Sequence, residues 1–471
     1  MNFSEVLGAS LGGGDGGAAV AWAGDGRLVA WPSPPSRLQV RDSATLQVIA
    51  TFNCADAVQE IAWAPDSQYL LSVSYKRGIV EVWAVGDPGW RCRVEGGSGG
   101  VIAAQWSPDS RHVLITAEFY VRVRVWSLVR GESVCCVARP KRGVAGGLFQ
   151  PWGFLVVAQR KDCRDYLTIY ETQDWTLVKT FPVCTRDLVG VAWGCLSPTH
   201  TPGHPTGHPR GHPSEGSLLI VWDSNLDYNL ALYSLSGHCL GSYSAYDMAL
   251  GVSDCALSPS RQFLAVSSHD HKVRLLSYPP QSGSRVTPPL PSPPPPPPPA
   301  SVWCTRKVEH TTQDSPQLLP QHATPPSPPS PWSTTPPKTA PPQPPPRQAP
   351  MVAFSSDGRY LATRRLDMPC AVWIWDISSI SLKAVLVHED SVKDLAWDPK
   401  SSRLALVTGG CHVFFWSPLG TVAVAVPSGP HLRLGGLRWH PFGRCLLVYD
   451  RKHLSVCFLN HPHPPTTSKN P

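Results

Sequence analysis

Residues 61–71 read Ile-Ala-Trp-Ala-Pro-Asp-Ser-Gln-Tyr-Leu-Leu, and residues 104–114 read Ala-Gln-Trp-Ser-Pro-Asp-Ser-Arg-His-Val-Leu. Pro followed by Asp-Ser presets and closes a turn, and the apolar runs on either side are typical of strands buried in a packed sheet. Each stretch therefore predicts a strand, a tight turn and a second strand.

The same phrase recurs along the chain at a nearly constant period. Six of the eight separations between its Trp positions fall between 41 and 44 residues. The positions, including those where another residue replaces Trp, are Trp22, Trp63, Trp106, Phe149, Trp193, Leu257, Phe354, Trp397 and Trp439. About twenty residues beyond most of them comes an alternating apolar run that ends in an aromatic residue, such as residues 80–83, and a fourth apolar run follows. Four short strands in every 40–45 residues are the repeat of a WD-type β-propeller blade.

The predicted fold class is therefore all-β, a WD-repeat β-propeller of about eight to nine four-stranded blades. The ninth unit supplies only about three strands, in residues 437–439, 445–448 and 454–459. We expect residues 2–6 to complete it, so that a single ring closes without a free sheet edge. Because nine units exceed the usual four to eight blades, a degenerate unit or two smaller or incomplete propellers remain alternatives.

Composition divides the chain into globular and low-complexity parts. Of its 52 prolines, 27 lie in residues 279–350, a tract too polar and too Pro-rich to bury a core. A Gly-His-Pro phrase recurs in residues 197–216. The sequence predicts blades in residues 1–278 and 351–460, disordered inserts at 197–216 and 279–350, and a disordered tail at 461–471.

Charge and hydropathy argue against several classes of function. The net charge of +7 is spread over 471 residues without a long basic block, so a nucleic-acid partner is not favoured. No apolar run approaches the length of a membrane span, and residues 1–17 lack the pattern of a secretory signal. The 14 cysteines include no Cys-x-x-Cys pair, so neither a zinc site nor a disulfide framework is expected. We expect a soluble, intracellular chain.

No motif in the sequence predicts catalysis, a metal or a cofactor. His200, His204, His208 and His212 are four residues apart, but the prolines and glycines between them forbid the helix that would stack their rings. The glycine-rich residues 12–17 lack the Lys-Ser or Lys-Thr of a phosphate-binding loop. There is also no nucleophile elbow and no carboxylate pair set apart from the turns. The chain is interpreted as a protein without enzymatic activity.

Six residues are candidates for a partner-binding surface. Lys76 and Arg77, like Arg160 and Lys161, stand where the second strand of a blade turns into the third. Their alternative interpretation is ordinary surface charge. Tyr243 and Tyr246 fall between two units. Tyrosine is a frequent interface anchor, but it is equally common in strand packing.

Several stretches resemble a particular WD-repeat family. They are residues 1–6 (Met-Asn-Phe-Ser-Glu-Val), 75–78 (Tyr-Lys-Arg-Gly), 162–166 (Asp-Cys-Arg-Asp-Tyr), 243–246 (Tyr-Ser-Ala-Tyr) and 371–377 (Ala-Val-Trp-Ile-Trp-Asp-Ile). They resemble the centrosomal WD-repeat family encoded antisense to tumour-protein-73, and the match runs from residue 44 to 459 apart from the Pro-rich tracts. The repeats are atypical, since the usual Gly-His start is nearly absent and Trp-Asp survives only at residues 222–223 and 375–376.

The resemblance implies a scaffold in the cytoplasm, at the centrosome, the spindle pole and centriolar satellites. It implies pairing with a coiled-coil anchoring protein, the synovial-sarcoma-X-breakpoint-interacting protein, in microtubule minus-end anchoring and cilium assembly. One alternative is a substrate receptor of a cullin-type ubiquitin ligase. Such receptors carry Trp-Asp-x-Arg, whereas here Ser224-Asn225 and Ile377-Ser378 follow the two Trp-Asp pairs. A second alternative is an RNA- or ribosome-associated propeller, conceivable at a charge of +7.

Overall fold

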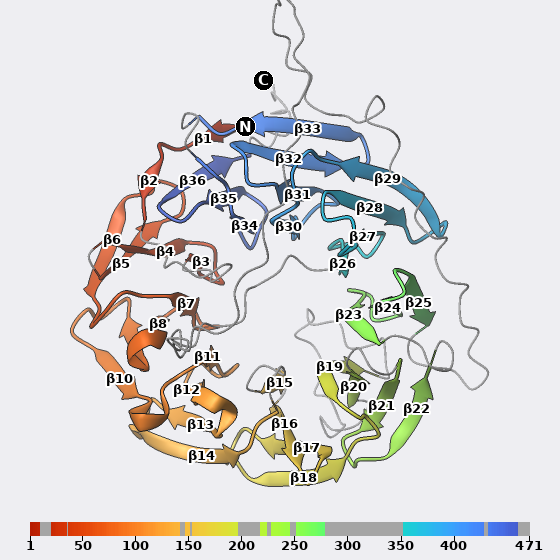
Figure 1. Ribbon diagram of the computed structural model, residues 1–471. Helices are drawn as coiled ribbons and strands as arrows, with labels where there is room; N and C mark the ends of the chain where they lie inside the picture. Colours follow the sequence, from red (N-terminus) through yellow and green to blue (C-terminus); the bar gives the residue numbers. More distant parts are fainter. Residues whose placement is uncertain are drawn as a thin grey trace, which may run out of the picture.

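The chain folds into a ring of nine antiparallel sheets (Figure 1). The computed structural model describes residues 1–9, 20–34, 36–141, 147–150, 153–195, 217–223, 228–244, 251–277, 352–427 and 432–459. The predicted all-β propeller is therefore confirmed, as one ring of nine blades rather than two smaller propellers. We number the blades 1 to 9 from β3 onward and name the strands of each blade a to d from the ring axis outward.

The strands of each blade follow one another in sequence, except in blade 9. Blade 1 holds β3 (Ala21–Trp22), β4 (Leu28–Ser33), β5 (Arg37–Asp42) and β6 (Val48–Asn53); blade 2 holds β7 (Glu60–Trp63), β8 (Tyr69–Ser74), β9 (Ile79–Ala84) and β10 (Arg91–Glu95). Blade 3 holds β11 (Ala103–Trp106), β12 (His112–Thr116), β13 (Arg122–Ser127) and β14 (Glu132–Ala138); blade 4 holds β15 (Leu148–Gln150), β16 (Phe154–Lys161), β17 (Arg164–Glu171) and β18 (Leu177–Pro182).

The second half of the ring repeats this pattern. Blade 5 holds β19 (Leu188–Cys195), β20 (Ser217–Asp223), β21 (Leu230–Ser234) and β22 (Cys239–Tyr243); blade 6 holds β23 (Val252–Leu257), β24 (Phe263–Ser268) and β25 (Val273–Ser277). Blade 7 holds β26 (Val352–Phe354), β27 (Tyr360–Arg364), β28 (Ala371–Asp376) and β29 (Ser381–Val387); blade 8 holds β30 (Asp394–Trp397), β31 (Leu404–Val407), β32 (His412–Ser417) and β33 (Gly420–Ala425). Blade 9 holds β34 (Gly436–Trp439), β35 (Cys445–Tyr449), β36 (His453–Phe458) and, outermost, β1 (Asn2–Phe3) and β2 (Leu7–Gly8).

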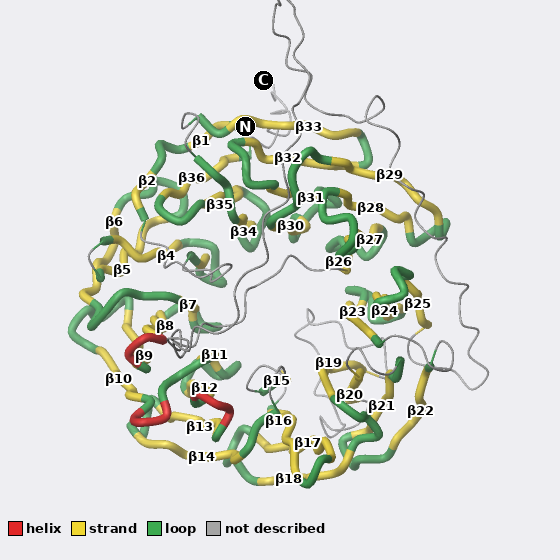
Figure 2. The backbone as a smooth tube through the Cα atoms, viewed as in Figure 1, coloured by secondary structure: helices red, strands yellow, loops and turns green. Residues whose placement is uncertain are grey.

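Helical structure in the described residues is limited to three short 3-10 turns, the red segments of Figure 2. They are η1 (Tyr75–Arg77), η2 (Gly97–Gly99) and η3 (Glu118–Tyr120). No helix in this part of the chain has the length and hydropathy of a membrane span.

The apolar strands are explained by burial on both faces of each sheet. In β20, Leu219 and Val221 pack toward blade 4, whereas Leu218 and Ile220 pack toward blade 6. Alternate side chains of a strand point to opposite faces, so a blade with two neighbours needs apolar residues at consecutive positions. The described residues form one hydrophobic cluster at each of the nine junctions between neighbouring blades.

The recurring Trp lies on the innermost strand, where it joins its blade to the preceding one. In six blades its indole N–H donates to a backbone carbonyl on the innermost strand of that neighbour, over 2.9–3.1 Å. The pairs are Trp22 to Arg438, Trp63 to Ala21, Trp106 to Ala62, Trp193 to Leu148, Trp397 to Ala353 and Trp439 to Ala396. The sequence period thus reflects a repeated bond between blades as well as a repeated sheet.

Three blades carry a residue without an indole N–H at this position: Phe149, Leu257 and Phe354. Between blades 3 and 4 the donor comes instead from Gln105, whose Nε2 donates to Gly147 O over 2.6 Å. The junctions on both sides of blade 6 are held by apolar clusters.

The amino-terminal segment closes the ring, as predicted. Asn2 pairs with Phe458 and Phe3 with Cys457, and the adjacent β2 pairs with the other end of the same strand. The Trp22 N–H bond to Arg438 O then joins blade 1 to blade 9.

The predicted inserts at 197–216 and 279–350 and the tail at 461–471 lie outside the described residues. The first falls between β19 and β20, and the second between β25 and β26. Blade 6 has three strands in the described part of the chain.

The bond between blades can be tested with Trp106→Phe. This substitution keeps an aromatic ring against Tyr69 but removes the 2.9 Å bond to Ala62 O. We expect the free energy of unfolding to fall by about 1 kcal/mol beyond the loss in packing, measured by chemical denaturation. Trp90→Phe is the matched control, because Trp90 also contacts Tyr69 but its indole N–H has no acceptor among the described residues. Equal losses for the two variants would contradict the role of the bond.

Candidate partner-binding face

Antiparallel order divides the connections of every blade between two faces of the ring. The a–b and c–d connections lie at one end of the strands, and the b–c and d–a connections lie at the other. We call the second end the b–c face. Five of the six predicted residues are described, and all five lie on it: Lys76 and Arg77 in η1, Arg160 and Lys161 at the end of β16, and Tyr243 at the end of β22. Tyr246 lies outside the described residues.

Lys76 and Arg77 occupy a turn that is tied down at several points. Arg77 Nε lies 2.9 Å from Asp56 Oδ2, and the backbone N–H of Lys76 donates to Gln59 Oε1 over 3.2 Å. Gly78 ends the turn at a φ of 64°, where a Cβ would lie 3.1 Å from Gly100 Cα. Both basic side chains are exposed, but the charge of Arg77 is partly satisfied within the chain.

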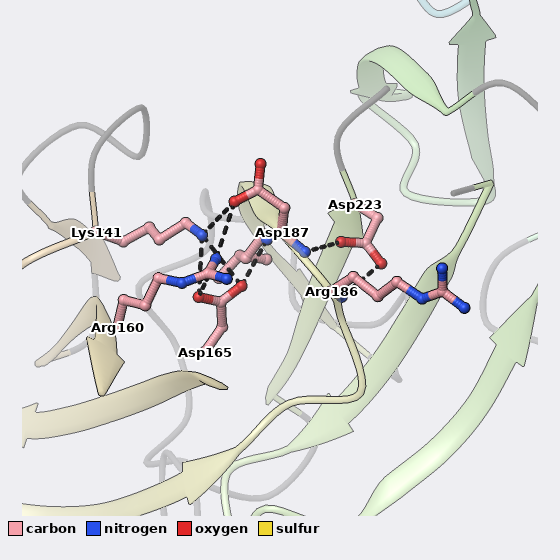
Figure 3. Close-up of polar contacts among 7 residues, drawn as sticks. Lys141, Arg160, Asp165, Arg186, Asp187 and Asp223 are labelled. Atoms are coloured by element: carbon pink, nitrogen blue, oxygen red, sulfur yellow. Dashed lines mark hydrogen bonds and ion pairs between the residues drawn. The ribbon is translucent and has the colours of Figure 1, made fainter. Parts of the chain in front are cut away.

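Arg160 belongs to a network of charges joining blades 3, 4 and 5 (Figure 3). At its centre is Asp165, whose side chain is fully buried. Lys141 Nζ, itself 6% exposed, lies 3.0 Å from Asp165 Oδ1 and also pairs with Asp187. Arg160 Nη1 lies 3.3 Å from Asp165 Oδ1 and 3.0 Å from Asp187 Oδ1. Arg160 therefore stabilises the contact between blades, although 40% of its side chain remains exposed.

Backbone amides complete the network on the blade 5 side. Leu188 N donates to Asp165 Oδ2 over 2.7 Å. Asp223 is buried at the end of β20 and accepts from the backbone N–H groups of Arg186 (3.0 Å) and Asp187 (2.7 Å). Figure 3 shows the Arg186 guanidinium extending away from the cluster. The network fixes the connection between β18 and β19 on the b–c face.

Tyr243 packs against a second tyrosine of the same blade. It is the last residue of β22, is half-buried, and its ring packs edge-on against Tyr228 with centroids 6.0 Å apart. Burial raises the pKa of the Tyr243 phenol above its ordinary value. Tyr243 is therefore mainly a packing residue.

The most exposed aromatic residue among those described on this face is not one of the residues predicted from the sequence. Phe119, in the b–c connection of blade 3, is 82% exposed, and Val121 beside it is 56% exposed. The turn is closed by Ala117 N donating to Arg122 O (2.9 Å), and Arg139 N donates to Val121 O (2.9 Å). The side chains are thus presented from a hydrogen-bonded turn. The sequence feature that could have indicated this exposure is Phe-Tyr-Val in a b–c connection, where most other blades carry polar or glycine residues.

This turn is also strained. Phe119 has φ 57° and Tyr120 has φ 54°, a left-handed conformation that is unfavourable for residues with bulky side chains. Strained, exposed residues concentrate at binding sites, because folding alone does not select them. Phe119 is therefore the strongest candidate for a binding anchor on the b–c face.

Exposed basic side chains lie in the b–c face connections of blades 2, 3 and 4. Five exposed ones have no ion-pair partner among the described residues: Lys76, Arg122, Arg139, Lys161 and Arg164. The acidic Glu118 and Asp162 lie in the same connections. We define these five cations, with Phe119 and Val121, as the basic–aromatic patch. Its composition suits an acidic partner segment that carries an apolar side chain.

No metal-binding cluster of three or more His, Cys, Asp or Glu side chains occurs in the part of the chain that the structure describes. The carboxylates of the charge network, Asp165, Asp187 and Asp223, are bonded to Lys141, Arg160 and backbone amides. The four candidate histidines of residues 200–212 lie outside the described residues.

The buried network can be tested with Lys141→Met. This change leaves the Asp165 carboxylate buried beside a half-exposed Arg160. The free energy of unfolding should fall by about 3 kcal/mol or more, measured by chemical denaturation. Asp187→Asn removes only the partner that is 45% exposed and should cost less than about 1 kcal/mol. A loss below about 1 kcal/mol for Lys141→Met would show that the network does not hold the blades.

The strain at Phe119 can be tested with a pair of variants. Phe119→Ala keeps a Cβ in the left-handed conformation, whereas Phe119→Gly removes it. We expect the glycine variant to exceed the alanine variant in free energy of unfolding by about 1 kcal/mol, measured in parallel denaturation curves. The opposite order would show that the turn is not strained.

Comparison with known proteins agrees with this architecture. The chain is 37% identical over 478 residues to WD repeat-containing protein WRAP73 from Mus musculus, covering 98% of this chain and 96% of that protein. Residues 233–277 match the model of the WD domain, G-beta repeat.

Solved propellers are similar in fold alone. The Dos1 propeller has a TM-score of 0.53 at 11% identity, covering 84% of this chain and 90% of that structure. Saccharomyces cerevisiae Sqt1 has a TM-score of 0.52 at 12% identity, covering 86% and 96%. With its nine blades, its repeated Trp bonds and a relative aligned over nearly the whole chain, this protein belongs to the WRAP73 family of WD-repeat proteins.

Proposed function

We propose that this chain is a scaffold at the centrosome and spindle pole that performs no catalysis. In this proposal it pairs with a coiled-coil anchoring protein, the synovial-sarcoma-X-breakpoint-interacting protein. The pair supports anchoring of microtubule minus ends, centriolar-satellite targeting and cilium assembly. The sequence resemblance supports this proposal, and so does the membership of a WD-repeat family whose propellers are scaffolds for protein interaction.

The basic–aromatic patch is the observation on this molecule that carries the proposal. An amphipathic helix of a coiled-coil protein offers an apolar stripe flanked by charged residues. Phe119 supplies an apolar anchor in a closed turn, so little conformational entropy is lost when it becomes buried. Five exposed cations on the same face have no ion-pair partner among the described residues, and they match acidic residues beside the stripe.

The alternative of a ubiquitin-ligase receptor is less well supported. The two Trp-Asp pairs lack the following Arg, and their carboxylates have structural roles. Asp223 accepts from backbone amides of the β18–β19 connection. Asp376 accepts from the backbone N–H of Ser378 over 3.0 Å. An RNA-associated function would use the same five cations without needing Phe119.

Proximity labelling in dividing cells tests the proposal. The full chain and a variant lacking residues 279–350 should both label the coiled-coil centrosomal partner. Phe119→Ala should reduce this labelling at least severalfold, because truncation of a central aromatic anchor costs about 2 kcal/mol or more. Val129→Ala is the matched control: Val129 is 76% exposed in the c–d connection of the same blade, on the opposite face.

Other outcomes would count against it. Recovery of ribosomal proteins in place of centrosomal ones would favour the RNA-associated function, as would co-sedimentation with RNA that is released at higher salt. Equal loss with Phe119→Ala and Val129→Ala would show that the patch is not the partner surface. Turnover of a small substrate by the purified chain would contradict a role without catalysis.

A further inference from the structure

The outermost strand of blade 8 is an uncharged sheet edge. β33 reads Gly-Thr-Val-Ala-Val-Ala, and all its residues except the half-buried Val424 are exposed. Leu419, in the turn before it, is 99% exposed. Figure 1 shows β33 at the periphery of the ring, and no described strand pairs with its outer side. An exposed, uncharged edge of this kind readily pairs with another strand.

The other described outer strands carry features that discourage such pairing. Five of them, β6, β14, β18, β22 and β29, have a bulge or register shift against their neighbours. β10 has a regular register but carries Arg91, Arg93 and Glu95. β1 and β2 have two residues each, and β25 carries the buried, inward-pointing charge of Arg274. β33 has none of these features. Its pairing with β32 is unbroken, from Gly420 opposite Ser417 to Ala425 opposite His412.

The register identifies which backbone groups face outward. Val426 N donates to Cys411 O over 2.9 Å, so these two residues form a hydrogen-bonded pair. Such pairs alternate with non-bonded pairs along an antiparallel ladder. The backbone groups that bond to β32 are therefore those of Gly420, Val422 and Val424. The N–H and C=O groups directed away from the sheet are those of Thr421, Ala423 and Ala425.

These outward groups are symmetric about Ala423. We propose that the β33 edges of two copies of this chain pair antiparallel about a two-fold axis at Ala423. In that arrangement Ala423 lies opposite its own copy and Thr421 opposite Ala425, giving about six backbone hydrogen bonds. Val422 lies opposite Val424, a favourable pair of β-branched residues. No charged side chain of β33 opposes the pairing.

The contact is small compared with a standard interface, so the dimer is weak and reversible. The inference depends on the β33 edge and is independent of the proposed partner at the b–c face. A chain that dimerises but fails to label a centrosomal partner would contradict the proposed function alone.

Sedimentation equilibrium of the full chain over about 1–100 μM measures the association. The weight-average mass should rise from monomer toward dimer across this range. Ala423→Pro removes an outward N–H that the blade itself does not use, a position where edge strands tolerate proline. Ala423→Lys places two positive charges opposite each other at the axis. Each substitution should raise the dissociation constant tenfold or more.

A matched control comes from β10. Gly96 N donates to Gly78 O over 2.7 Å, so by the same alternation Arg93 has its N–H directed outward. Arg93→Pro should leave the association unchanged. In hydrogen exchange, the Ala423 amide should become protected as concentration rises, whereas the Arg93 amide should not.

The proposal is wrong if the chain is monomeric throughout the range. It is also wrong if a dimer persists in both Ala423→Pro and Ala423→Lys. Protection of the Ala423 amide at every concentration in a monomer would show that a segment of the same chain occupies the edge, and this outcome too would overturn the proposal.

Discussion

The structure depends on sheets that are apolar on both faces. In β20, consecutive residues pack toward opposite neighbours, so removal of either neighbour would expose half of the buried side chains of the strand. No blade can therefore be stable alone, and each depends on a complete ring. The Trp N–H bonds also align neighbouring blades, because each connects one innermost strand to a defined carbonyl of the preceding innermost strand. Apolar packing holds the blades together, and the indole bonds set how they are aligned.

The sequence predicts the ring well because the same strand pattern recurs in nearly every blade. The Trp, or the apolar residue that replaces it, marks the innermost strand, and all nine positions assigned from the period lie on or at the end of such strands. The closure by residues near the amino terminus followed from the missing strand of the ninth unit. The carbonyl groups that accept the indole bonds could not be predicted from the sequence period, since they depend on how adjacent sheets face each other.

The features of the candidate partner-binding face could be predicted only in part. The basic pairs at residues 76–77 and 160–161 were correctly placed in b–c connections, because turn chemistry locates those connections. The role of Arg160 in a buried network was hidden, since Lys141 and Asp187 lie far from it in sequence and meet it only across blades. Phe119 was missed because aromatic residues are usually assigned to a core. Its exposure results from a left-handed backbone that a sequence pattern does not reveal.

The pairing of β1 with β36 has a consequence for synthesis of the chain. About 450 residues separate the two strands, and ribosomes add roughly 5–20 residues each second. After synthesis, β1 must therefore wait roughly 20–90 s for the strand that completes its sheet. During that interval blade 1 also lacks the neighbour that covers Val29 and Trp31. Nascent chains consequently expose an incomplete ring, and protection by chaperones would be needed most before the carboxyl-terminal blade leaves the ribosome.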